Sequence, residues 1–263
     1  MPLQELESFE NVSPAVLWAM LIVGGLIVLV AAVSLAVSLW LMIKYVTYNR
    51  RKNTRGLTGQ DAARMILDNH GLGHIKVSTF GSMLFGNSYS HYFKKVRLRR
   101  LTTQKASITS LAMGAEKSAL AILDKEGDKD MRTRVVLTPL MYLGPLAVVP
   151  LLLIGVIVDI LFFRFSGVVT LVAAILSLAL FAVAFVLSIM TLKTEKKAQD
   201  RACLIMAEQD MATAEEIETM RELFRLYNIQ YVNDIILEFL QLIMRVLQLV
   251  AKLQQSSASS KSR

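Results

Sequence analysis

Three long apolar runs are the feature that most constrains what this chain can fold into. They extend over residues 15–43, 140–163 and 168–192, and Asp159 is the one charged residue within them. About 20 consecutive apolar residues cross the hydrocarbon core of a bilayer as an α-helix, so each run is long enough. The composition agrees, because 54% of the residues are hydrophobic and 19% are charged, against about 45–50% and about 25% in soluble domains. The sequence therefore predicts a mainly α membrane protein with three transmembrane helices.

The distribution of basic residues predicts how these helices cross the membrane. Only residues 164–167 separate the second run from the third, so these two runs form an antiparallel hairpin. Lys and Arg collect after the first run, before the second and after the third, whereas the residues before the first run include Glu5, Glu7 and Glu10 and no basic residue. Basic residues favour the cytoplasmic side. We expect a multi-pass plasma-membrane protein with its N-terminus outside and its soluble parts in the cytoplasm.

The three runs divide the chain into six segments. We expect an extracytoplasmic N-terminus, a transmembrane anchor, a small cytoplasmic α+β domain, a transmembrane hairpin, cytoplasmic helices of which the last is amphipathic, and a disordered tail. In that order, the bounds of the segments are 1–14, 15–43, 44–138, 139–192, 193–253 and 254–263.

Local patterns predict the elements of the cytoplasmic α+β domain. Thr58 and Asp61 form a capping box ahead of apolar residues at helical spacing. Residues 74–80 and 91–101 alternate between apolar and polar side chains and predict a two-stranded ribbon, which must pack on neighbouring helices to be stable. Helical spacing returns over residues 103–123.

The C-terminal part of the chain is predicted to be helical throughout. The third apolar run continues as a cytoplasmic helix over 194–208, and a capping box opens a second helix over 211–227. A last helix over 232–253 is apolar on most faces but carries Glu238 and Arg245 on one face. We expect this helix to pack on the protein or to lie in the membrane interface rather than to cross the membrane.

Charge and cysteine content limit the possible partners. The net charge is +8, and no nucleic-acid recognition motif accompanies it, so we expect the basic residues to face anionic lipid rather than nucleic acid. Cys203 is the one cysteine, which excludes an internal disulfide and a zinc site built from cysteines of this chain.

Asp159 lies within the second apolar run and has two interpretations. A charge inside a membrane helix indicates a functional site by default. However, Asp159 is about one turn from Arg164, where it could form an ion pair or reach water, and we favour this structural interpretation.

The order of these parts resembles a known family. The stretch RGLTG at residues 55–59 is the most specific piece, with a helix behind it and the pieces HY at 91–92 and VRL at 96–98. Together with an anchor helix, a hydrophobic hairpin and a cytoplasmic helical pair, these pieces resemble the bacterial membrane zinc metallopeptidases of the YugP-like kind, over roughly residues 40–250. The resemblance implies a zinc peptidase fold and a peptide-binding groove.

In that family, the helix after the ribbon carries an HExxH motif, whose two histidines bind zinc and whose glutamate acts as general base. The motif falls on Ala115-Glu116-Lys117-Ser118-Ala119 in this chain, so both histidine positions hold alanine. The resemblance places the third, acidic ligand at Glu195. Alanine cannot bind metal, and a catalytic zinc needs about three protein ligands. We therefore expect no cofactor, with Glu116 as a vestigial base and Lys117 able to pair with Glu195 or Glu116.

Other histidines offer one alternative metal site. The resemblance places His91 in the lining of the active site, where it could join Glu116 and Glu195 to hold a zinc ion. His70 and His74 have metal-like spacing, but Gly71 and Gly73 lie between them at a helix end, which favours coincidence.

Three hypotheses for function remain open at this point. The first is a catalytically inactive homologue that acts as a scaffold or as a partner of peptides or other membrane proteins. The second is an active metallopeptidase with an altered zinc site. The third is a non-protease membrane accessory subunit, for which Asp159 is the main hint.

Overall fold

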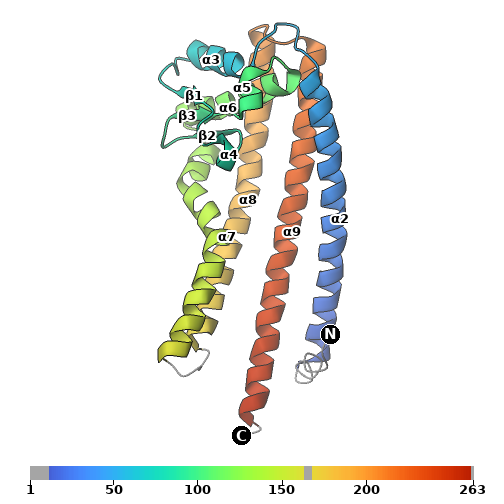
Figure 1. The fold of residues 1–263 in the computed structure, drawn as a ribbon, viewed down its shortest axis with the longest axis vertical. Coiled ribbons are helices and arrows are strands. Elements are labelled where there is room, and N and C mark those ends of the chain that lie inside the picture. Colours follow the sequence, from blue (N-terminus) through green and yellow to red (C-terminus); the bar gives the residue numbers. More distant parts are fainter. Residues whose placement is uncertain (1–11, 163–167, 262–263) are drawn as a thin grey trace. The chain divides into compact units, whose positions relative to one another are not determined.

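The computed structural model describes residues 12–162 and 168–261, without the side chains of 84–85, 139–149 and 256–261. The described chain is mainly helical (Figure 1). Its contacts divide it into two compact units. The first unit contains Met1–Ser34, Thr138–Ser188 and Asn233–Arg263, and the second contains Leu35–Leu137 and Ile189–Val232.

Four long helices contribute residues to both units. They are α2 (Pro14–Arg50), α7 (Lys129–Phe162), α8 (Val168–Glu208) and α9 (Ala214–Lys261). Among the described residues, α2 and α8 are long and apolar enough to cross a membrane, and Pro150–Phe162 of α7 is a shorter apolar stretch. Two of the three expected spans therefore correspond to α2 and α8, whereas the expected span on α7 stays a prediction. The expected turn at 164–167 lies outside the described residues.

Within the first unit, α7 and α8 pack closely as a hairpin. A Cβ atom added to Gly155 would lie 2.9 Å from the Cβ of Ala173, so the helices approach each other at a position without a side chain. Asp159 of α7 is buried and accepts hydrogen bonds from the backbone N–H groups of Val169 and Thr170, at 3.2 and 2.7 Å. Asp159 therefore caps the first turn of α8, where backbone N–H groups have no partner within the helix.

The C-terminal helix differs from the sequence expectation. The helices expected over 211–227 and 232–253 are one continuous helix, α9, which also runs through most of the tail expected to be disordered. No glycine or proline interrupts α9, so nothing in the sequence forces a break. The capping box is confirmed, since Thr213 N–H donates to Glu216 and Glu216 N–H donates to Thr213 Oγ1.

The second half of α9 packs on other helices of the first unit, which is one of the two places that the sequence analysis allowed for it, and its cytoplasmic location stays a prediction. Ser13 at the start of α2 donates a backbone hydrogen bond to Gln254, and Ser34 Oγ donates to Asp234. This half of α9 therefore runs antiparallel along the apolar half of α2. The ring of Phe239 also stacks on Phe185 of α8, at 5.3 Å between centroids.

The second unit surrounds one buried helix, α6 (Ile108–Glu126). Around it lie α3 (Gly59–Asn69), α5 (Arg100–Gln104) and a small sheet. Ser107 caps α6 by accepting the N–H of Ser110, and Gly127 ends the helix with a positive φ of 71°. Every residue from Ile108 to Leu123 is buried, so α6 forms the core of this unit.

The sheet has three strands, where the sequence predicted two. Strand β3 (Lys95–Arg97) lies in the middle, parallel to β1 (Lys76–Ser78) and antiparallel to β2 (Ser88–Ser90). The short helix α4 (Ser82–Phe85) lies between β1 and β2 in the chain. Both predicted strands are present, as β1 and β3, and they pair with each other. The prediction of two strands is incomplete because Ser88–Ser90, outside the predicted strands, supplies β2 on the other side of β3.

The crossing of α3 and α6 depends on two glycines. A Cβ atom on Gly114 of α6 would lie 2.3 Å from the carbonyl oxygen of Gly59, and one on Gly59 would lie 2.4 Å from that of Thr102. Both contacts are to backbone atoms, which cannot rotate away. Gly59 ends the RGLTG stretch, and its neighbour Thr58 forms the predicted capping box with Asp61, at 3.0 and 3.2 Å.

We expect Gly114→Ala to destabilise the protein by about 1–3 kcal/mol, because overpacking at a backbone contact outweighs the better helix propensity of alanine. The measurement is the thermal unfolding midpoint of the detergent-solubilised protein. Gly73→Ala is the matched control, since a Cβ atom there would lie at an ordinary 3.4 Å from Asp68. Equal midpoints for Gly114→Ala and the unmodified chain would show that the helices do not touch at this point.

Candidate functional site

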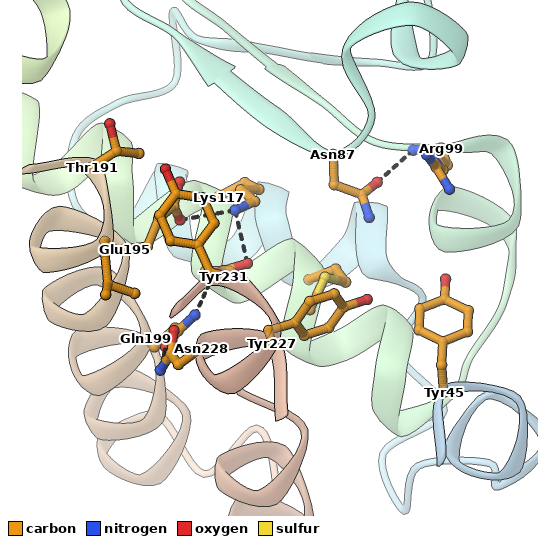
Figure 2. Close-up of a pocket in the computed structure, with 13 residues that line it drawn as sticks. Tyr45, Asn87, Arg99, Lys117, Thr191, Glu195, Gln199, Tyr227, Asn228 and Tyr231 are labelled. Atoms are coloured by element: carbon orange, nitrogen blue, oxygen red, sulfur yellow. Dashed lines mark hydrogen bonds and ion pairs between the residues drawn. The ribbon is translucent and has the colours of Figure 1, made fainter. Parts of the chain in front are cut away.

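The second unit buries a cluster of charged side chains from α6, α7 and α8. Lys117 of α6 lies at its centre, with its Nζ 2.9 Å from Glu116 Oε2 and 3.0 Å from Glu195 Oε2. Arg134 of α7 donates to the other oxygen of Glu195, at 2.5 Å. The side chains of Glu116 and Lys117 are only 5% and 10% exposed, so water does little to screen these charges. Figure 2 shows Lys117 and Glu195 facing each other across the site.

A chain of amide groups extends the charged cluster from α6 to α9. Gln199 lies four residues after Glu195 on the same face of α8, and its Nε2 donates to Glu116 Oε1 at 2.9 Å. Asn228 of α9 donates to Gln199 Oε1 at 2.8 Å. Both oxygens of Glu116 thus accept a hydrogen bond, from Lys117 on one side and from Gln199 on the other.

Burial and charge act in opposite directions on the three titrating groups. Burial favours the neutral form of Glu195, but the positive charges of Arg134 and Lys117 prevail and lower the pKa of this carboxyl to about 2. Burial would lower the pKa of Lys117, but the negative charges of Glu116 and Glu195 raise it. Burial raises the pKa of Glu116, and the charge of Lys117 offsets part of that rise. Lys117 is therefore protonated and Glu195 ionised at neutral pH.

A cavity of about 330 Å³ opens beside the cluster (Figure 2). Three tyrosines line it, namely Tyr45 of α2 and Tyr227 and Tyr231 of α9. The remaining lining residues are Asn87, Arg99, Met113, Glu116, Lys117, Thr191, Leu192, Glu195, Gln199 and Asn228. The cavity therefore combines aromatic surface with hydrogen-bonding groups, which is typical of ligand sites.

The residues around this site do not fit a zinc ion. Ala115 and Ala119 are fully buried in α6 and have no donor atoms. Lys117 already bridges the carboxylates of Glu116 and Glu195. Zinc prefers a tetrahedral set of nitrogen, sulfur and oxygen ligands, whereas this site offers carboxylates paired with an ammonium group. Within the described ranges, no group of three or more His, Cys, Asp or Glu side chains is placed to hold a metal.

His91 does not lie with Glu116 and Glu195. It follows β2, and its Nδ1 lies 2.7 Å from Asp124 Oδ2, near the C-terminal end of α6. Tyr89 donates to the same carboxylate at 2.6 Å, and Lys94 lies 3.4 Å from it. His91 is absent from the lining of the cavity. The structure therefore does not bring together the three residues of the altered zinc site.

The other sequence candidates occupy structural positions. The Nδ1 of His70 lies 2.8 Å from the carbonyl oxygen of Ile66 at the end of α3, and His74 is exposed in the following loop. Asp159 caps α8 within the first unit, through Val169 and Thr170. The possible ion pair between Asp159 and Arg164 falls outside the described residues.

Sequence reasoning missed several residues of the site. Arg134 was counted only among the basic residues that flank a span, although it binds Glu195. Gln199 carried a usable signal, because its spacing of four from Glu195 places both on one helix face. The tyrosines of α2 and α9 carried none, since only the fold brings them to α6.

These features define a mainly helical protein in which Glu116 of the buried helix α6 and Glu195 of the long helix α8 share one site. The family described as "putative neutral zinc metallopeptidase" matches residues 22–250, which is most of the chain, and the protein belongs to this family. The zinc metallopeptidase family that the resemblance predicted is thereby confirmed, whereas the loss of the zinc-binding motif and a bacterial origin stay predictions. No match was found among curated proteins or among solved structures.

We expect Lys117→Met to destabilise the protein by about 3–5 kcal/mol at pH 7, because removing one partner leaves buried charge uncompensated. The depressed pKa of Glu195 stabilises the fold above the usual pKa of 4.5, and this contribution disappears as the pH falls toward about 2. The variant keeps the part of this contribution that comes from Arg134 but loses the part that comes from Lys117. It also buries Glu116 and Glu195 without the ammonium group between them, so protonation of one carboxylate relieves the variant. Its deficit in unfolding midpoint should shrink between pH 7 and pH 5.

Lys196→Met is the matched control, because Lys196 is exposed on the same helix as Glu195. It should change the midpoint little at either pH. A Lys117→Met deficit that is no larger than the control, or one that does not depend on pH, would contradict the bridging role of Lys117.

Proposed function

We propose that this protein is a catalytically inactive, membrane-anchored member of its metallopeptidase family, acting as a scaffold or binding partner for peptides or other membrane proteins. The position of Lys117 carries the proposal. Its ammonium group lies 2.9 Å from Glu116 and 3.0 Å from Glu195, the residues that the family resemblance assigns as base and acidic ligand. A cation of the chain itself thus neutralises both carboxylates, and Ala115 and Ala119 offer no ligand beside them.

The contacts of Glu116 with Lys117 and Gln199 argue against a role for Glu116 as a general base. A general base must accept a proton from the attacking water within hydrogen-bond reach. Both carboxylate oxygens of Glu116 already accept hydrogen bonds, from Lys117 and Gln199. The alternative of an altered zinc site receives no support from the geometry, because His91 is held by Asp124.

The cavity supports a role in binding. Tyr45, Tyr227 and Tyr231 provide rigid aromatic surface, and Asn87 and Asn228 provide donors and acceptors of the kind that a peptide backbone can use. Such a site can hold an extended segment without cleaving it. The apolar lengths of α2 and α8 support membrane anchoring and fit the proposal that the partners are themselves membrane proteins or peptides near the bilayer.

The first test is the zinc content of the purified, detergent-solubilised protein, measured by elemental mass spectrometry on a preparation without a histidine tag. We expect no stoichiometric zinc at saturating supply, because the candidate ligands are already paired with Lys117. About one zinc per chain that disappears in Glu195→Ala would contradict the proposal. Proteolysis that chelators abolish and Glu116→Gln removes would contradict it as well.

The second test is binding of a fluorescent pool of random nonapeptides, followed by anisotropy. We expect saturable binding to the unmodified protein and its loss in Leu192→Trp, because the larger side chain fills part of the cavity. Leu204→Trp is the matched control, since Leu204 is an exposed leucine of the same helix and does not line the cavity. Equal binding by both variants would place the peptide elsewhere.

A further inference from the structure

The register of the small sheet sorts its side chains onto two faces. Val77, Val96 and Tyr89 form one row across the three strands, and Val96 is fully buried. Successive side chains of a strand point to opposite faces. The residues before and after each member of this row therefore point to the opposite face of the sheet. We name this surface the outer sheet face, and it consists of Lys76, Ser78, Ser88, Ser90, Lys95 and Arg97.

Two aromatic rings lie over the cations of the outer sheet face. The Nζ of Lys95 is 5.2 Å from the ring centroid of Phe80, and the guanidinium carbon of Arg97 is 5.5 Å from that of Phe93. The two phenylalanines are 80% and 73% exposed, and Met83 on the adjacent α4 is 97% exposed. Large apolar side chains gathered at one exposed place indicate an interaction site.

The charged side chains of the segment that contains the small sheet are all positive. Residues 69–115 contain no aspartate or glutamate and seven basic residues. The carboxylate of Asp124 in α6 is already held by Tyr89, His91 and Lys94. The outer sheet face therefore offers positive charge and exposed aromatic side chains together, without acidic side chains from its own segment.

We propose that the outer sheet face binds the surface of an anionic lipid bilayer. Lysine and arginine near such a surface are attracted by its negative potential, and aromatic rings favour the headgroup region. Lys76, Lys95 and Arg97 supply the charge, and Phe80, Phe93 and Met83 supply the apolar side chains that enter the interface. This inference rests on the membrane anchoring of the proposed function and is independent of zinc and of the cavity.

Chain connectivity favours lipid over a free anionic partner. Helix α2 continues without a break from its apolar part into residues of the second unit, so an inserted α2 tethers the outer sheet face near the bilayer. Tethering makes the second contact intramolecular and raises its effective concentration. Weak electrostatic attraction is then sufficient to hold the surface on the membrane.

The test uses the full chain with Cys203→Ala and Met83→Cys, carrying an environment-sensitive fluorophore at position 83. The protein is placed in nanodiscs of phosphatidylcholine, alone or mixed with phosphatidylglycerol. We expect emission at shorter wavelength in the mixed discs and quenching by spin-labelled lipid. Both effects should be lost at high salt, because salt screens exposed charges, and in the double variant Lys76→Glu, Lys95→Glu. A label at Gln60→Cys, at an exposed position of α3, is the control and should stay aqueous throughout.

Each other outcome overturns the inference. A label at position 83 with aqueous emission in both kinds of disc would show that the surface stays in water. Short-wavelength emission without quenching by spin-labelled lipid would show contact with protein instead. Failure of the chain to enter discs at all would contradict the membrane anchoring itself, so the two failures are distinguishable.

Discussion

The second unit of this protein depends on the ion pairs that the buried Lys117 forms with Glu116 and Glu195. Two carboxylates, Glu116 and Glu195, come from different helices, and burying them unpaired would be costly. Lys117 lies between them, and Arg134 binds the far side of Glu195. Each of the four groups has a partner of the opposite kind, so the cluster can remain inside the unit and join α6, α7 and α8. The proposed function rests on this pairing, because groups that are already paired have little capacity left for a metal or a reacting water.

A second constraint is the close approach of α3 and α6. Helices usually pack about 8–10 Å apart, whereas Gly114 lies so near the backbone of Gly59 that a side-chain carbon would overlap it. The same contact holds α6 where Glu116 faces Gln199 and Lys117 faces Glu195. Gly59 therefore contributes to the site without touching it, which gives a physical reason for the glycine that ends the RGLTG stretch.

The sequence predicted the candidate site only in part. The positions of Glu116, Lys117 and Glu195 came from the family resemblance, and the pairing of Lys117 with both glutamates is confirmed by the structure. The sequence analysis expected His91 beside Glu116 and Glu195, but the structure places its ring against Asp124. A functional role for His91 stays a prediction. Glu116 and Asp124 lie about two turns apart on α6. The sequence could not show which of these turns would pack against the end of β2, where His91 lies.

The sequence by itself determined the apolar helices, the capping boxes at Thr58 and Thr213, and the family, because these depend on local composition, spacing and short motifs. The tertiary structure decided what depends on contacts between distant segments. It supplied the third strand, the continuous α9 packed along α2, the capping of α8 by Asp159, and the tyrosines of the cavity. The pattern of a helix shows which face is apolar but not which helix will cover it, and a three-residue strand is too short to show a period.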